Sequence, residues 1–190
     1  MSDRTSLPAS YFESRYQADI DPWRFRTSDY EKQKYQATVG ALTKRRYRRG
    51  LEVGCSIGVL TAMLADRCDH LLALDGSETA IREAETKPLP NVRFEVAYVP
   101  QDFPAGSFDL IVLSEMLYYL SRADLDDLAR RCVAALAPDG EIIICHWLGE
   151  TNYPLTGDEA SDLFIAAVRD SLTNRALLHH ETYRLERLSR

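Results

Sequence analysis

The strongest constraint on the fold is an alternation that begins at Leu51, where short apolar runs alternate with segments whose apolar residues recur at helical spacing. Parallel strands need a long crossover connection, so this alternation is typical of a parallel sheet covered by helices on both faces. We predict an α/β fold with a doubly wound, mostly parallel sheet. Its strands are expected at "GLEVG" and at residues 70–75, 91–96, 108–114 and 141–147.

Capping signals and turn residues mark the segments between the strands. Three predicted helices begin with a capping pair, in which a Ser or Thr is followed three residues later by an acid. Ser77 can cap a fourth helix. Another helix is expected at about residues 59–67. A "PDG" turn precedes the fifth strand, and the Tyr183/Leu185 alternation predicts an antiparallel or edge strand. The capping pairs are Ser28 with Glu31, Ser121 with Asp124 and Thr156 with Glu159, and the first begins a helix from residue 29 to about 42.

The size and composition of the chain suit a single domain at residues 1–190, because 190 residues with 45% hydrophobic content can bury one sizeable core. We expect an N-terminal helical lid in residues 1–45 and the core in residues 46–190. A net charge of −6 argues against a nucleic-acid partner. No apolar run approaches the ~20 residues of a membrane span, so a cytoplasmic protein is expected. Four cysteines without a C-x-x-C pair, and histidines without ligand spacing, predict no metal site.

Residues 11–35 are rich in aromatic side chains. Two interpretations stay open: the rings pack the first helices against the sheet, or some of them close over a ligand. The seven aromatics are Tyr11, Phe12, Tyr16, Trp23, Phe25, Tyr30 and Tyr35.

The loop "GCSIG", residues 54–58, has the G-x-S-x-G pattern of a serine hydrolase. That chemistry needs an oxyanion loop and usually several strands ahead of the serine, and this chain offers neither, although Asp109 and His146 follow. The dinucleotide pattern G-x-G-x-x-G fails as well, because Ser56 and Val59 stand where its second and third glycines would be. We therefore predict that Ser56 lines a cofactor loop and is not a nucleophile.

An acid at the end of the second strand, Asp75, lies 21 residues beyond Gly54. In doubly wound sheets the ligand binds at the carboxyl ends of the strands, where an acid can accept hydrogen bonds from both hydroxyls of a ribose. Glu52 adds a carboxylate beside the loop, which would repel a pyrophosphate but suits a cofactor with an ammonium and a sulfonium.

The segments "LEVGCSIGVLT", "LLALD", "FDLIVLSEMLYYL" and "LAPDGEIII" together resemble the successive motifs of the seven-strand, Rossmann-like S-adenosylmethionine-dependent methyltransferases. A narrower likeness lies in "DPWRF", "SDYEKQKY" and "SEMLYYL", which are similar to the nodulation protein S family, N-methyltransferases of the deacetylated amino sugar of chitin oligosaccharides. The chain departs from the common motifs at Ser56, where a glycine is usual, and after the third strand, where Ala97, Tyr98 and later Asp102 replace an acid near the adenine.

The resemblance implies S-adenosylmethionine as cofactor and N-methylation of a small-molecule amine such as a deacetylated amino sugar. The alternatives are O- or C-methylation of another metabolite, or a protein that binds the cofactor without turnover. The resemblance leaves the oligomeric state open. The cofactor-binding residues would be Glu52, Gly54, Cys55, Ser56, Gly58, Asp75, Gly76, Ser77, Ser114 and Glu115. The catalytic candidates are Glu115, Tyr118, Tyr119 and His146, and the substrate or lid residues are Trp23, Tyr30 and Trp147.

Overall fold

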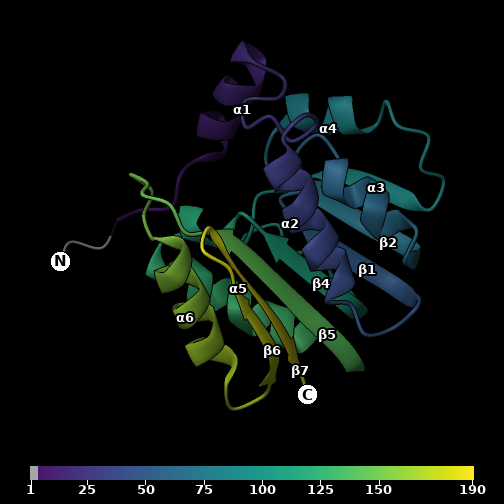
Figure 1. The fold of residues 1–190 in the computed structure, drawn as a ribbon, viewed down its shortest axis with the longest axis vertical. Coiled ribbons are helices and arrows are strands. Elements are labelled where there is room, and N and C mark those ends of the chain that lie inside the picture. The colour runs from purple at the N-terminus through teal and green to yellow at the C-terminus, as the bar shows by residue number, and fades with distance from the viewer. Residues whose placement is uncertain (1–3) are drawn as a thin grey trace.

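The computed structural model describes residues 4–190, in which seven strands form one sheet (Figure 1). The strands are β1 (Tyr47–Val53), β2 (Cys68–Asp75), β3 (Val92–Val96), β4 (Phe108–Ser114), β5 (Leu136–Trp147), β6 (Thr173–His179) and β7 (Tyr183–Ser189). The helices are α1 (Ala9–Ala18), α2 (Asp29–Gly40), α3 (Val59–Ala65), α4 (Glu78–Ala84), α5 (Arg122–Ala135) and α6 (Gly157–Val168), and a 3₁₀ turn, η1, spans Leu117–Tyr119.

The order of the strands is β3-β2-β1-β4-β5-β7-β6. Strands β1 to β5 are parallel, whereas β7 runs antiparallel to both β5 and β6. The strand order reverses between β1 and β4, so the chain leaves the carboxyl ends of these two strands in opposite directions. The predicted doubly wound, mostly parallel sheet is therefore confirmed, as is the antiparallel strand at Tyr183.

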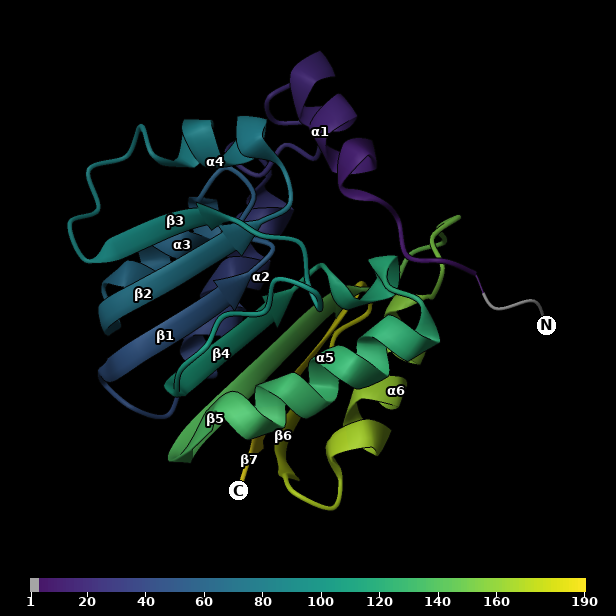
Figure 2. The same cartoon turned by 180° about the vertical axis from the view of Figure 1, so that it is seen from behind.

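Helices cover both faces of the sheet because the side chains of its central strands alternate between two apolar clusters. In β4, Leu110 and Val112 pack with α2 and α3, whereas Ile111 and Leu113 pack with α5 and α6. Helix α2 lies in front of the sheet in Figure 1, and α5 lies in front of it in Figure 2. A strand that is apolar on both faces needs such double cover, which explains the continuous apolar run of β4.

Three details of the chain differ from the sequence expectations. The "PDG" sequence lies within β5 rather than before it, at a register shift where Phe108 pairs with Leu136 but Leu110 pairs with Glu141. Strand β6 was not predicted, and all of its residues are exposed. Helix α2 ends at Gly40, two residues before the expected end. Within residues 4–190, no helix combines the length and the apolar character that a bilayer crossing would need.

Candidate active site

A cavity of about 400 Å³ lies at the carboxyl ends of β1, β2 and β4. Its floor is formed by the ends of these strands and by the loop after β1. Side chains from α1, α2 and the segment between these helices complete the wall, including Tyr16, Trp23 and Phe25. The segment expected to form a lid thus lies against the place where a doubly wound sheet binds its ligand.

The loop after β1 has the tight, left-handed backbone that a close approach to a ligand requires. The φ angles of Gly54, Ser56 and Gly58 are 80°, 52° and 74°. A Cβ on Gly54 would lie 3.2 Å from Cβ of Met116, so a side chain at this position would be both strained and crowded. Ser56 adopts its positive φ without being glycine, which is uncommon and concentrated at functional sites.

Asp75 connects this loop to the end of β2. Its Oδ2 accepts a hydrogen bond from the Ser56 amide at 2.8 Å, and its Oδ1 accepts one from the Ser77 amide at 2.9 Å. Burial raises the pKa of Asp75 to about 6, although these two amides favour the ionised form. Each carboxylate oxygen has a second lone pair, so Asp75 can still accept hydrogen bonds from a ligand in the cavity that it lines.

Two polar side chains fasten helix α1 to the site, Tyr16 to the loop after β1 and Glu13 to the start of α4. The Tyr16 hydroxyl donates to Ser56 Oγ at 2.6 Å, and Glu13 accepts hydrogen bonds from Ser77 Oγ at 2.6 Å and from the Thr79 amide at 3.1 Å. The hydroxyls of Ser77 and Thr79 lower the pKa of Glu13 to about 2. Ser56 is thus bonded to a tyrosine rather than to a histidine, which argues against a hydrolase.

The residues before α1 cross toward η1 and α5 and form what we call the strap, residues 4–8. The Leu7 amide donates to the Tyr119 carbonyl at 2.9 Å, and the Tyr98 hydroxyl donates to the Leu7 carbonyl at 2.5 Å. The Ser121 amide donates to Ser6 Oγ at 2.8 Å. These bonds hold Leu7 in the wall of the cavity.

The side chain of Glu115, at the end of β4, is held by residues of three elements, α2, η1 and β5. Its backbone has a φ of 56°, and its Oε1 lies 2.6 Å from Lys34 Nζ on α2. Its Oε2 accepts hydrogen bonds from the Tyr118 hydroxyl and from the Trp147 amide, the latter at 3.1 Å. Burial alone would raise the pKa of Glu115, but Lys34 and the hydrogen bonds outweigh it and lower the pKa. A carboxylate with a lowered pKa is a weak base, so this arrangement favours a positioning role.

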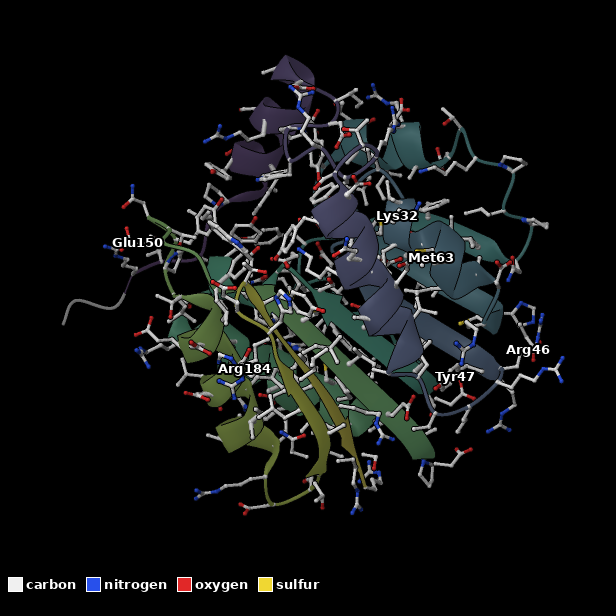
Figure 3. The ribbon with its side chains drawn as sticks, viewed as in Figure 1. Lys32, Arg46, Tyr47, Met63, Glu150 and Arg184 are labelled. Atoms are coloured by element: carbon white, nitrogen blue, oxygen red, sulfur yellow. The ribbon has the colours of Figure 1, made fainter. Side chains whose placement is uncertain are left out.

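Lys34 is the buried cation of the site, with a side chain only 1% exposed, whereas Lys32 on the same helix is exposed (Figure 3). Its Nζ lies 3.0 Å from Glu31 Oε1 as well as against Glu115, and it sits 5.0 Å from the centre of the Tyr30 ring. Burial would lower the pKa of Lys34, but the two carboxylates raise it above its usual value. Lys34 is therefore charged at neutral pH.

Aromatic rings form the wall near η1. Tyr119 meets Tyr118 at a centroid distance of 4.6 Å, Tyr153 at 4.7 Å and Phe12 of α1 at 4.9 Å, each edge to face. Burial raises the pKa of both Tyr118 and Tyr119 well above the usual tyrosine value. Both phenols are therefore neutral at physiological pH and can act as hydrogen-bond donors.

His146 takes a structural position behind this wall. It is fully buried, and its Nε2 accepts a hydrogen bond from the Leu117 amide at 3.1 Å. Burial lowers its pKa to about 4, so the ring is neutral at physiological pH with its proton on Nδ1. The ring supports η1, the turn that carries Tyr118 and Tyr119.

Most of the residues predicted for the site converge on the cavity. Gly58 instead begins α3, Ser77 caps α4 and binds Glu13, and His146 lies as described; none of these three is among the described residues that line the cavity. Those that line it are Glu52, Gly54, Cys55, Ser56, Asp75, Gly76, Ser114, Glu115, Tyr118, Tyr119, Trp23, Tyr30 and Trp147.

Sequence reasoning missed several polar members of the site. Glu31 was interpreted only as part of a capping box, and Lys34 falls in "EKQK", whose composition is typical of a solvated helix face. Glu13, on α1, was not considered at all. The available signal was the spacing of Glu31 and Lys34, an acid and a base three residues apart, but the same spacing is common on exposed helices. After β3, Ala97 and Tyr98 line the cavity, whereas Asp102 is exposed and binds the Tyr98 amide.

Known structures share this architecture. The N-methyltransferase NodS from Bradyrhizobium japonicum WM9, solved in complex with S-adenosyl-l-homocysteine, superimposes with a TM-score of 0.81 at 23% identity and covers 96% of this chain and 98% of that one. A protein from Pseudomonas syringae, described as a candidate methyltransferase, matches with a TM-score of 0.74 at 39% identity, over 85% of this chain and 99% of that one. The fold is therefore the Rossmann-like fold of the S-adenosylmethionine-dependent methyltransferases.

Sequence comparison narrows this class to one family. The model of the nodulation protein S (NodS) family matches residues 11–151, so this chain belongs to that family. Nodulation protein S of Bradyrhizobium diazoefficiens is 35% identical over 128 residues, which cover 65% of this chain and 61% of that protein. The match spans between 56% and 61% of the length of three nodulation protein S relatives.

Proposed function

We propose that this protein transfers a methyl group from S-adenosylmethionine to a small-molecule amine. The observation that carries the proposal is the pairing of the left-handed loop after β1 with Asp75 at the end of β2, both facing one cavity. Membership of the nodulation protein S family supports it, because a solved family member is an N-methyltransferase that binds the demethylated cofactor.

The chemistry of the cavity fits such a cofactor. Among the described residues that line it, four are acids and one is a lysine. Burial raises the pKa of Glu52 to about 7, so this acid is only partly ionised at neutral pH, but acids still outnumber bases in the wall and favour a ligand that carries positive charge. Asp75 retains acceptor capacity for ribose hydroxyls, and Gly54 leaves space that a Cβ would fill. The acids are Glu31, Glu52, Asp75 and Glu115, and the lysine is Lys34.

When bound, the cofactor supplies a methyl group that is already activated on a sulfonium. The task of the protein is then to hold the acceptor in line with that methyl, and such positioning can contribute on the order of 7–11 kcal/mol. Gly54, Cys55 and Ser56 would hold the methionine portion, Asp75 the ribose, and Ala97 and Tyr98 the adenine edge. The strap and α1 would exclude water from the reacting atoms.

We further propose that the acceptor is a deacetylated amino sugar. The aromatic wall of Tyr118, Tyr119 and Tyr153 suits the face of a sugar ring. The Tyr118 hydroxyl donates to Glu115 and can accept from a sugar hydroxyl, whereas the neutral phenol of Tyr119 can donate to one. An amine attacks only in its neutral form, and a lysine-like amine with a pKa of about 10.4 would be roughly 0.1% or less neutral at pH 7. A less basic amino sugar therefore suits a site whose buried base, Glu115, is weak.

Two matched acceptors test this proposal. Calorimetry should first show that the protein binds S-adenosylhomocysteine. Methyl transfer from labelled cofactor should then appear on chitosan oligosaccharides, which have free amines, and not on fully acetylated chitin oligosaccharides of the same length. Methyl transfer to both oligosaccharides would indicate that a hydroxyl group, rather than the amine, is the methyl acceptor. Cofactor binding without transfer to chitosan or to a metabolite extract would identify a binding protein rather than an enzyme.

A further inference from the structure

Glu31 occupies a helix position whose usual role it does not perform. It is the third residue of α2 after the N-cap Ser28, and its amide donates to Ser28 Oγ at 3.3 Å. In a full capping box the acid would accept the N-cap amide in return, as Glu159 does for Thr156 at 3.0 Å in α6. The Ser28 amide instead donates to the Arg24 carbonyl at 2.9 Å. The carboxylate of Glu31 is therefore free to turn inward.

The carboxylate of Glu31 is buried, and only one of its two oxygens accepts a hydrogen bond of good geometry. The residue is 8% exposed, and its Oε1 binds Lys34 Nζ at 3.0 Å. Its Oε2 is shielded from solvent and accepts no hydrogen bond of good geometry from the described residues, although the nearby Tyr35 hydroxyl favours its ionised form. A buried acceptor without a donor costs free energy, more so when it is charged. Because Glu31 lines the cavity, a ligand can supply the missing donor.

The charges around Glu31 specify what kind of donor fits. Lys34 lies between two carboxylates, Glu31 and Glu115, so the group of three carries one negative charge in excess when all are ionised. Burial raises the pKa of Glu31, and a cationic ligand at this carboxylate would stabilise its ionised form. Glu115 already accepts two hydrogen bonds on its other oxygen. Of the oxygens in this group, Glu31 Oε2 and Glu115 Oε1 accept no hydrogen bond of good geometry, but Glu115 Oε1 lies 2.6 Å from Lys34 Nζ, so the acceptor left for a ligand is Glu31 Oε2. A sulfonium has no N–H to donate and a ligand carboxylate would be repelled, whereas an ammonium or amine matches both charge and hydrogen bonding.

We infer that Glu31 binds a primary ammonium or amine of the ligand through its free Oε2. The inference rests on the proposed function, in which two ligand groups have this chemistry: the α-amino group of the cofactor and the amine of the acceptor. Glu31 is thereby a recognition residue for the cationic group of the ligand. Lys34 positions the Glu31 side chain by binding its other oxygen, Oε1.

Calorimetry on Glu31→Gln distinguishes the two sources. The substitution keeps the shape of the side chain and removes its charge, and losing a charge-assisted hydrogen bond is expected to weaken the affected ligand about 10- to 150-fold. If Glu31 binds the cofactor amine, the variant loses affinity for S-adenosylhomocysteine but binds its deaminated analogue as the wild type does. If it binds the acceptor amine, S-adenosylhomocysteine binds normally and a chitosan tetramer, added at saturating S-adenosylhomocysteine, binds more weakly.

Two further variants serve as controls. Glu159→Gln makes the same change at the same helix position outside the cavity and should bind both probes as the wild type does. Glu31→Asp retains the charge and should recover part of the affinity. Equal affinities of Glu31→Gln and the wild type for both probes would overturn the inference, as would an equal loss for S-adenosylhomocysteine and its deaminated analogue. A wild type that binds no S-adenosylhomocysteine would refute the proposed function instead.

Discussion

Replacing Lys34 by methionine tests whether its buried charge stabilises the fold at the site. Methionine is close in size and apolar, so the change removes the ammonium with little change in packing. Two carboxylates, Glu31 and Glu115, then remain buried against each other without a counter-charge. Breaking a buried pair by removing one partner typically costs 3–5 kcal/mol. For a chain of this size, that loss corresponds to a decrease in melting temperature of roughly 6–20 °C.

The pH dependence of the loss of stability in Lys34→Met follows from the pKa of Glu115. In the wild type this pKa is lowered, so the carboxylate contributes stability above its unfolded pKa, and that contribution disappears as the pH falls through the folded pKa. Without Lys34, burial raises the pKa instead. The variant then loses stability as the pH rises from the unfolded value, about 4.3, toward neutrality. The difference between the two proteins should therefore be larger at pH 7.5 than at pH 5.

Urea denaturation of the wild type, Lys34→Met and Lys32→Met at these two pH values measures the effect. Lys32 is exposed on the same helix, and its replacement should change the free energy of unfolding by no more than about 0.5 kcal/mol. If Lys34→Met were as stable as Lys32→Met at pH 7.5, or if its deficit were larger at pH 5, the electrostatic reasoning would be wrong.

Three other changes probe the proposed cofactor site and the proposed lid. Asp75→Ala should weaken S-adenosylhomocysteine about 10- to 150-fold in calorimetry because the ribose would lose a charged acceptor. Asp170→Ala, at an exposed position after α6, should leave the affinity unchanged, and equal affinities for both variants would contradict the site. Ser56→Gly should relieve the strain of the positive φ, and this gain should largely offset the lost hydrogen bond to Tyr16. The variant should therefore retain cofactor binding in equilibrium dialysis. A variant that binds cofactor but has no methyl-transfer activity would reopen the hydrolase interpretation. Deleting residues 1–26 should leave a cooperatively folding core that has lost methyl transfer, since that segment supplies cavity wall; full activity of the truncated protein would exclude a lid.

The sheet could be predicted from the sequence because burial imposes a pattern on it. Strand β4 is buried along its whole length, and its continuous apolar run can satisfy two helical layers at once. The position of Asp75 also followed from sequence, since parallel strands end at one edge of the sheet. Strand β6 lacked any such signal: each of its residues is exposed, including Leu177 and Leu178, so its sequence carries no alternation between a buried and an exposed face.

The polar interior of the site could not be predicted for a different reason. Glu31 and Lys34 have the composition of a solvated helix, and only the tertiary position of α2 over the end of β4 buries them against Glu115. Glu115 was expected near the ligand, and it lines the cavity. Its partner Lys34 is far away in sequence, and such partners determine whether a carboxylate can act as a base or only positions other groups. A pKa is a property of the assembled environment, which short motifs do not encode.

The slight burial of α1 bears on how the site opens. Of its ten residues only Tyr16 is buried, and the helix is fastened to the molecule chiefly by a few polar contacts to the loop after β1 and the start of α4. Segments with so little apolar contact unfold locally at a much lower free energy than the core. The amide protons of α1 should therefore exchange with solvent far faster than those of β1 and β4, and S-adenosylhomocysteine should slow them selectively. Because Phe12 and Tyr16 of α1 line the cavity, local unfolding of this one helix would open its wall without any movement of the sheet.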